Sequence, residues 1–314
     1  MHLYALLSSR IQLHEPLLDV GCALGGFLDY LQGKGYTNLA GVERTAAYVK
    51  EARRKNCLTI EPGDAEALPF REGTFSAIVV EQVLEHLVSP ARALREARRV
   101  LRKGGFLCVG VPDAERYGES CYFDFYWLLL REHVQHFHLD SLASMAEHEG
   151  FELVDAVRTD QPVMSDRMVM PVLYALFRRK ERMTVSNWSN DRGVLRENLT
   201  AYIGTQMNRL SNKRRLLAKI ADTQRPVYAW GIGREFFYLY AAAGLRKCRL
   251  AGLIDLNPFK QRTVRIGGLP VTGPDILRGA ARDSIVVVTA IAHAGAIRDR
   301  LCQLGYEGEV LVPE

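Results

Sequence analysis

Four acidic residues among the first hundred positions accompany short apolar runs at regular intervals. Asp19 and Glu43 lie at or near the end of such runs, and Asp64 and Glu81 follow the next two. An ionised carboxylate at the end of a buried strand needs a partner, because burying an unpaired charge is costly. The two hydroxyl groups of a ribose would be suitable partners for Glu43. The spacing therefore predicts a ligand site lined by acids.

A glycine-rich turn lies within the first of these runs, between Leu17 and Leu28. Gly21 and Gly25 allow the backbone to adopt positive φ and to approach a ligand closely. Many nucleotide-binding folds use such a turn, so the turn alone predicts a site without identifying the ligand. Asp19 either contacts that ligand or orients the turn, and both interpretations are open.

The elements that must position these residues alternate in type through about residue 160. Five apolar runs read as strands and are followed by segments of helical period: Pro16–Val20, Leu39–Glu43, Thr59–Pro62, Phe75–Val80 and Phe106–Val111. Such alternation predicts parallel strands joined by right-handed crossovers, a doubly wound α/β sheet. Ligands of these sheets bind beyond the carboxyl ends of the strands, where the acids and the glycine turn fall.

The domain boundaries follow from the pattern further along the chain. Two more strands, Phe151–Thr159 and Met168–Arg178, are expected to pair antiparallel at the sheet edge and complete a first domain over residues 1–182. Residues 183–224 contain no strand pattern and predict a helical linker. Residues 225–314 return to α/β alternation, which predicts a second, smaller Rossmann-like domain.

The second domain carries its own candidate site. Gly231, Gly233 and Arg234 form a glycine turn at the start of a helix, an arrangement that can hold an anion. Asp255 ends the next strand, in the position of a ribose-binding acid. We therefore expect these four residues to bind part of a substrate. The alternative is a unit that serves assembly alone.

Over residues 16–160 the sequence closely resembles the class I S-adenosylmethionine (SAM)-dependent methyltransferases. The resemblance implies that SAM is the cofactor and that its binding residues are Asp19, Gly21, Cys22, Gly25, Glu43, Asp64, Ala65 and Glu81. Within that set, the turn would lie under the methionine portion, Glu43 would hold the ribose, and Asp64 with Ala65 would flank the adenine. Ala23 stands where the family usually has glycine.

Three histidines lie close together in the segment Arg131–His138, after an aromatic stretch that includes Tyr126, a candidate substrate contact. Histidine suits proton transfer near neutral pH, so we expect His133, with His136 and Glu132, to serve catalysis. The spacing does not place all three histidines on one helical face, and no cysteine accompanies them. We therefore expect no metal.

The histidine segment is also similar in part to bacterial sugar C-methyltransferases, and so is the second domain. In that comparison His133 is the proposed base, although Leu130 replaces an expected tyrosine. The resemblance implies a nucleotide-sugar acceptor held partly by residues 225–314. A purely structural role for His133, in packing a lid, stays open.

The composition of the chain indicates in which compartment the protein works and which kinds of partner it binds. The 314 residues are 48% hydrophobic, no apolar run approaches the roughly 18–20 residues of a membrane span, and the first ten residues lack signal-peptide features. Six scattered cysteines without CxxC spacing suit reduced thiols in a cytoplasmic protein. Net charge is −3 over residues 1–182 and +8 over the remainder, which favours an anionic small molecule there. Aromatics are not interleaved with the basic residues, so nucleic acid is disfavoured.

The sequence thus predicts a SAM-dependent methyltransferase that acts on a nucleotide sugar, a glycan or a natural-product precursor. One alternative is a small aromatic or lipid-like acceptor, with the second domain used for oligomerisation. Another is a non-catalytic scaffold of the same fold. The segment before the first strand is short for the helices that usually close over SAM. A second copy of the chain, in a homo-oligomer, or a partner chain could therefore complete the site.

Overall fold

The computed structural model of the protein describes residues 2–56, 59–119, 127–129, 131–163, 165–182 and 193–313. These residues form two compact units. The first consists mainly of residues up to 200, and the second mainly of residues 201 onward. Each unit contains one sheet with its own hydrophobic core.

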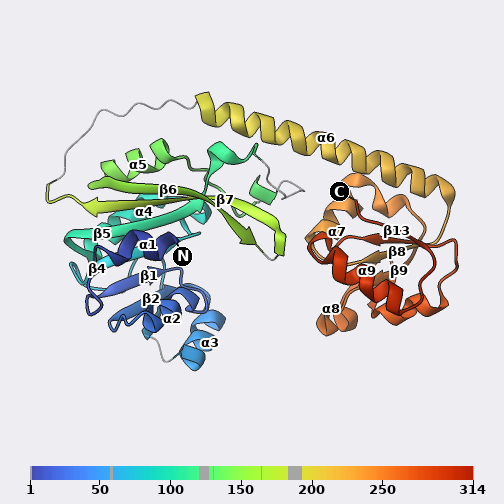
Figure 1. Ribbon diagram of the computed structural model, residues 1–314, viewed down its shortest axis with the longest axis horizontal. Helices are drawn as coiled ribbons and strands as arrows, with labels where there is room; N and C mark the ends of the chain where they lie inside the picture. The colour runs from blue at the N-terminus through green and yellow to red at the C-terminus, as the bar shows by residue number, and fades with distance from the viewer. Residues whose placement is uncertain are drawn as a thin grey trace. The chain divides into compact units, whose positions relative to one another are not determined.

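The first unit is built on a seven-stranded sheet with the order β3-β2-β1-β4-β5-β7-β6 (Figure 1). The strands are β1 (Leu17–Val20), β2 (Leu39–Glu43), β3 (Thr59–Pro62), β4 (Phe75–Glu81), β5 (Leu101–Pro112), β6 (Phe151–Val163) and β7 (Ser165–Arg179). Strands β1 to β5 are parallel, and β7 pairs antiparallel with β5. Because β1 has β2 on one side and β4 on the other, the sheet has its switch point at the carboxyl ends of β1 and β4.

Apolar side chains on both faces of the central strands form the core of this sheet. Every residue of β1 is buried, and so are the first six of β4, as expected for parallel strands covered on both faces. The helices are α1 (His2–Ser8), α2 (Gly26–Gly33), α3 (Ala46–Asn56), α4 (Pro90–Val100) and α5 (Leu139–His148). Leu94 of α4 and Leu142 of α5 belong to one hydrophobic cluster with Leu18 and Ile78 of the sheet. The predicted doubly wound α/β fold is confirmed.

Strand β5 begins earlier than the sequence predicts. Helix α4 ends at Val100 and β5 begins at the next residue, ahead of the predicted start at Phe106. Gly105 lies where β4 and β5 change register, and a Cβ there would come within 2.8 Å of the Ser76 carbonyl oxygen. The glycine is needed for this close approach of two strands.

The second unit has a six-stranded sheet with the order β10-β11-β9-β8-β12-β13. Its strands are β8 (Val227–Trp230), β9 (Leu250–Ile254), β10 (Arg265–Ile266), β11 (Leu269–Thr272), β12 (Ile285–Val288) and β13 (Glu309–Leu311). All neighbouring pairs are parallel except β10 with β11. Strand β8, between β9 and β12, gives this sheet a switch point of its own.

Helices α6 (Gly193–Thr223), α7 (Arg234–Tyr238), α8 (Pro258–Thr263) and α9 (Ala294–Gln303) accompany the second sheet. Leu217 and Ile220 of α6 lie in its hydrophobic core. The end of the predicted linker is therefore packed into the second unit. Helix α8 and the β10–β11 hairpin have no counterpart among the predicted elements. None of the helices that the structure describes is long and apolar enough to cross a membrane.

Candidate functional site

The loop from β1 to α2 lies at the switch point of the first sheet. Gly21 has φ 78° and Gly25, the N-cap of α2, has φ 79°. A Cβ on Gly21 would lie 2.4 Å from Cγ2 of Val83, the second residue after β4. Any side chain at position 21 would therefore clash as well as strain the backbone, and only glycine keeps this loop close to the end of β4.

Glu43, at the end of β2, holds this loop in place. Its side chain is buried, with one carboxylate oxygen accepting a hydrogen bond from the Ala23 N–H at 3.1 Å and the other accepting from the Thr45 N–H at 2.6 Å. The carboxylate thus has a fixed orientation, and its remaining lone pairs can accept bonds from ligand hydroxyls. Ala23 has φ 46°, a left-handed conformation that favours glycine, so alanine is strained at this position where the family usually has glycine.

Asp64 is placed beside Glu43 by the pairing of β2 and β3. The Gly63 N–H donates to the Glu43 carbonyl oxygen at 3.2 Å. One Asp64 carboxylate oxygen accepts from the Glu66 N–H at 2.9 Å, and the other lies 3.8 Å from Nε of Arg44. Asp64 therefore shapes the turn after β3. Ala65 in this turn is half-buried and packs against the core.

Two of the predicted cofactor residues have buried side chains. Asp19 is 5% exposed, and burial, together with the charges of Glu81 and Glu43, raises its pKa to about 7. The Cys22 thiol is packed over β2, because a Cβ on Gly41 would lie 2.6 Å from its sulfur, and burial raises its pKa to about 12. Both side chains are thus packed at the base of the loop.

Glu81, at the carboxyl end of β4, has a partner that no sequence motif indicates. Tyr174 of β7 donates its hydroxyl hydrogen to a Glu81 carboxylate oxygen at 2.8 Å. The three residues Glu81, Gly110 and Tyr174 are register partners on β4, β5 and β7. A Cβ on Gly110 would lie 2.7 Å from the Tyr174 ring, so the glycine makes room for the tyrosine to cross β5.

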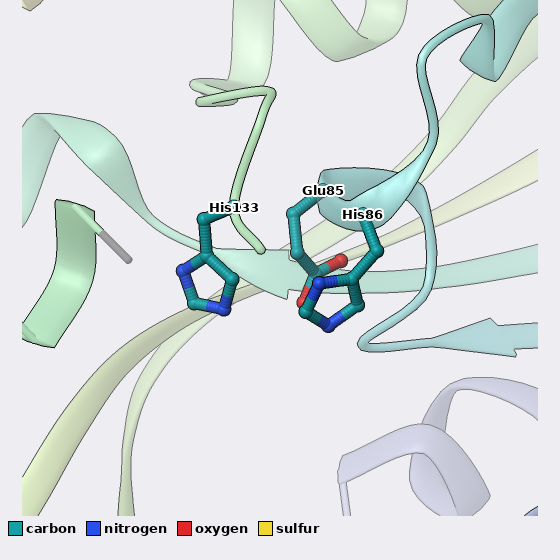
Figure 2. A group of neighbouring side chains, drawn as sticks. All are labelled: Glu85, His86 and His133. Atoms are coloured by element: carbon teal, nitrogen blue, oxygen red, sulfur yellow. The ribbon is translucent and has the colours of Figure 1, made fainter. Parts of the chain in front are cut away.

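A second group of side chains lies just past β4, in the short 3-10 helix η1 (Leu84–His86). Figure 2 shows Glu85 and His86 of η1 converging with His133. Glu85 is 1% exposed, and neither of its carboxylate oxygens has a hydrogen-bond partner among the described residues. Burial, with a smaller contribution from the Glu81 charge, raises the pKa of Glu85 to about 8.

Backbone contacts bring the segment that carries His133 to η1. The Glu85 carbonyl oxygen accepts hydrogen bonds from the N–H groups of Val134 and Gln135, at 2.9 and 3.1 Å. The imidazole rings of His86 and His133 have centroids 5.0 Å apart. Nε2 of His86 lies 4.0 Å from a Glu85 carboxylate oxygen. Burial is the main cause that lowers the pKa of His133.

The other predicted catalytic residues lie in different surroundings. Nδ1 of His136 is 3.3 Å from the Tyr117 hydroxyl, and burial lowers the pKa of this histidine. The Glu132 side chain is exposed, while its carbonyl oxygen is 2.9 Å from Nδ1 of His86. Tyr126 lies outside the described residues. His138, the third histidine of the segment, is the N-cap of α5, so the three histidines have different neighbours.

The second unit repeats the arrangement of the first at its own switch point. Gly231 has φ 106°, and a Cβ there would lie 2.4 Å from Cβ of Ala290. One Asp255 carboxylate oxygen accepts from the Ile232 N–H at 2.9 Å, as Glu43 accepts from Ala23. The same oxygen lies 2.8 Å from Nζ of Lys260, a residue that no sequence motif singles out.

Helix α7 is short. Gly233 is its N-cap, and Arg234 is its first residue. The α-helix continues for only five residues before a π-helical turn over Leu239–Ala243. The Asp255 carboxylate itself accepts hydrogen bonds from the Ile232 and Asn257 N–H groups and from Nζ of Lys260.

The comparison with known families agrees with the geometry of the first unit. Residues 1–156 match the family described as methyltransferase domain. This part of the chain is a methyltransferase domain. The match ends before α6 and the second sheet begin.

Relatives of the methyltransferase domain align with about a third of this chain. An uncharacterized 37.1 kDa transposon protein of Streptomyces fradiae is 38% identical over 106 residues, 32% of this chain and 30% of that protein. A chloroplastic 2-methyl-6-phytyl-1,4-hydroquinone methyltransferase of rice is 35% identical, over 31% of this chain and 32% of the enzyme. A ubiquinone/menaquinone biosynthesis C-methyltransferase of a Ruegeria species is 33% identical, over 30% and 41%. The chain thus spans less than half the length of these relatives.

SAM is the methyl donor of this kind of domain, and the switch point of the first sheet fits it. Gly21 keeps the loop free of a side chain, and the Glu43 carboxylate is held with spare acceptor capacity. The side-chain amide nitrogen of Gln82, directly after β4, is buried without a hydrogen-bond partner among the described residues. Donor and acceptor groups are thus present where an adenosyl ligand would need them.

Proposed function

We propose that this protein transfers a methyl group from SAM to a small-molecule acceptor. The observation that carries the proposal is the Glu43 carboxylate, fixed by the Ala23 and Thr45 backbone at the switch point, opposite the glycine loop. In this proposal the loop from Gly21 to Gly25 lies under the methionine portion of SAM. Glu43 accepts the ribose hydroxyls, and the Asp64–Ala65 turn borders the adenine.

The acids at the switch point also suit the charge of the cofactor. SAM supplies an electrophilic methyl group on a positively charged sulfonium. Asp19 and Glu81 lie near one another at the ends of neighbouring strands, and the Glu81 charge contributes to the raised pKa of Asp19. A cation at this edge would favour the ionised form of Asp19. The same acids would disfavour a negatively charged ligand.

The proposal is tested by calorimetric titration with S-adenosylhomocysteine (SAH), the product form of the cofactor. We expect wild-type protein to bind SAH and Glu43→Ala to lose roughly 10- to 100-fold in affinity, the range for hydrogen bonds to a charged group. Glu152→Ala, at an exposed position on β6, is the matched control. Absence of SAH binding by the wild type, or equal affinity in Glu43→Ala, would contradict the proposal.

His133 is proposed to serve the acceptor. Its Nδ1 lies 3.3 Å from the Leu128 carbonyl oxygen, and because a carbonyl can only accept, Nδ1 carries the hydrogen. Nε2 is then left with a lone pair directed away from that contact. We expect His133→Ala to lower turnover by roughly 10²–10⁴-fold and to leave SAH affinity unchanged, because a group that assists proton removal contributes about that much. Unchanged turnover would remove this assignment.

The class of acceptor is a separate proposal. A nucleotide sugar or related glycan precursor is supported by the second unit, where Gly231 and Asp255 repeat the arrangement of Gly21 and Glu43. Lys260 and the net charge of +8 after residue 182 would favour a phosphate-bearing ligand there. The quinone-type methyltransferases among the relatives favour a small aromatic acceptor instead.

Calorimetric titration, for binding, and a methylation assay, for turnover, distinguish these two classes of acceptor. Binding of a nucleotide sugar that is lost in Asp255→Ala, with SAH affinity retained, would support the first class. Methylation of a hydroquinone-type acceptor at equal rates in wild type and Asp255→Ala would support the second.

A further inference from the structure

We propose that Glu85, His86 and His133 bind one divalent metal ion of the zinc type. One potential ligand atom from each side chain lies within 4.8 Å of the other two, and Figure 2 shows the three side chains converging. In a tetrahedral site with bonds of about 2.0–2.2 Å, ligand atoms lie roughly 3.4 Å apart. Side-chain rotations that move the ligand atoms by the order of 1 Å would thus complete the site.

The two histidines are already oriented as metal ligands. Nδ1 of His86 lies 2.9 Å from the Glu132 carbonyl oxygen, and Nδ1 of His133 lies 3.3 Å from the Leu128 carbonyl oxygen. Carbonyl oxygens only accept, so both rings carry hydrogen on Nδ1 and a lone pair on Nε2. Metal-binding histidines have this arrangement, in which one ring nitrogen donates to a backbone carbonyl and fixes the ring for coordination by the other.

Glu85 supplies the second, independent observation. Its side chain is only 1% exposed, and both carboxylate oxygens lack hydrogen-bond partners among the described residues. An unpaired buried carboxyl is costly, whereas a cation within bonding distance would compensate it.

The backbone holds the ligands together before any ion arrives. Glu85 and His86 are consecutive residues of η1, and the Glu85 carbonyl accepts hydrogen bonds from Val134 and Gln135, which directly follow His133. The two segments therefore stay joined independently of the side chains. Such preorganisation lowers the conformational cost of binding.

The ligand set favours zinc or a similar transition metal. Two imidazoles and one carboxylate form the protein ligands of several catalytic zinc sites and also occur with iron(II), whereas Mg²⁺ prefers oxygen ligands alone. Three protein ligands would leave a coordination position open. An oxygen of the acceptor could occupy it, and the ion would then favour loss of the proton from that oxygen. This role rests on the proposed methyl transfer, but binding of the ion itself does not. With the ion bound, Nε2 of His133 would be a ligand, so this histidine would assist proton removal through the ion rather than as the base itself.

The test uses the full-length protein, treated with a chelator and then titrated with Zn²⁺ by calorimetry and with Co²⁺ by visible absorption. We expect one ion per chain and absorption bands of a four- or five-coordinate Co²⁺ ion. His86→Gln is the main variant, because this side chain is 42% exposed and its change should leave folding intact. We expect at least a 10-fold loss of affinity in His86→Gln and in Glu85→Gln. His14→Gln, an exposed histidine with no part in the proposed site, should bind the metal as the wild type does.

Two outcomes would overturn the inference. One is no stoichiometric binding of Zn²⁺ or Co²⁺, which would leave the three side chains as a proton-transfer group. The other is equal affinity in wild type and His86→Gln. SAH titration of the same samples separates the two proposals, because SAH binding without metal binding removes only the metal site. Metal binding without SAH binding removes only the methyl-donor function.

Discussion

At the scale of single residues, the loop after β1 contains two positions with positive φ that differ in what they tolerate. Gly21 has no space for a side chain, because a Cβ added there would clash with Cγ2 of Val83. Ala23 adopts φ 46° with its N–H bound to Glu43, so its conformation carries a small strain but satisfies a hydrogen bond.

This difference gives a paired prediction. We expect Gly21→Ala to destabilise the methyltransferase domain by about 2 kcal/mol or more and to weaken SAH binding, because a clash adds to backbone strain. Ala23→Gly should change the free energy of unfolding by less than about 1 kcal/mol, because relief of strain is offset by greater freedom in the unfolded chain. Urea unfolding measures both.

Val83→Ala provides the check on the cause. If the clash with Val83 dominates, the double variant Gly21→Ala/Val83→Ala should be less destabilised than the sum of the two single changes. Strict additivity would mean that the strained φ at Gly21, rather than the neighbouring side chain, determines the loss.

At the scale of elements, the register of β4, β5 and β7 determines the surroundings of Glu81. Gly110 leaves space above β5, and Tyr174 uses that space to reach the Glu81 carboxylate. Next to Tyr174, the His2 ring of α1 stacks with a centroid distance of 5.9 Å. Strand β7 and the first helix thus both contribute to the surroundings of Glu81.

We expect Tyr174→Phe to lower the free energy of unfolding by about 1.5–3 kcal/mol, because Glu81 loses a donor in a half-buried site. Tyr48→Phe, on the exposed face of α3, is the control. Gly110→Ala should be at least as damaging in the wild type but much less so when Tyr174 is alanine, since the clash requires the tyrosine ring. An equal effect of Gly110→Ala in both backgrounds, by urea unfolding, would contradict this account.

At the scale of the whole molecule, the stability of the methyltransferase domain should depend on pH in a defined direction. Burial raises the pKa of Asp19 to about 7 and that of Glu85 to about 8, so the folded chain binds these protons more tightly than the unfolded chain. Their contribution to stability is fully present below the ordinary carboxyl pKa of about 4. It is lost as the pH rises through 7 to 8.

We therefore expect the Tm of chelator-treated protein to fall by several degrees between pH 6 and pH 9. Asp19→Asn and Glu85→Gln should each flatten this decrease, because neither amide can ionise. Differential scanning calorimetry at a series of pH values measures the effect. A Tm that rises over this interval, or a slope unchanged in both variants, would show that other groups govern the pH dependence.

Much of the fold could be predicted from the sequence because its determinants are local. Alternating apolar runs and helical periods identify the parallel strands, and the carboxyl ends of such strands meet at one edge. Glu43 and Asp64 could thus be placed near the glycine loop from their positions at strand ends alone. The start of β5 was harder to predict, since the space at Gly105 is limited by the Ser76 backbone of a neighbouring strand.

The sequence by itself determined the doubly wound architecture and the family of the first domain, because strand ends and glycine turns are encoded within a few neighbouring positions. The residues that should hold SAM stay a prediction from the same local patterns. Only the tertiary structure decided which distant groups meet. Tyr174 lies 93 positions from Glu81, and His86 lies 46 positions from its partner Glu132. Such pairs depend on sheet register and loop closure, and no local pattern specifies either.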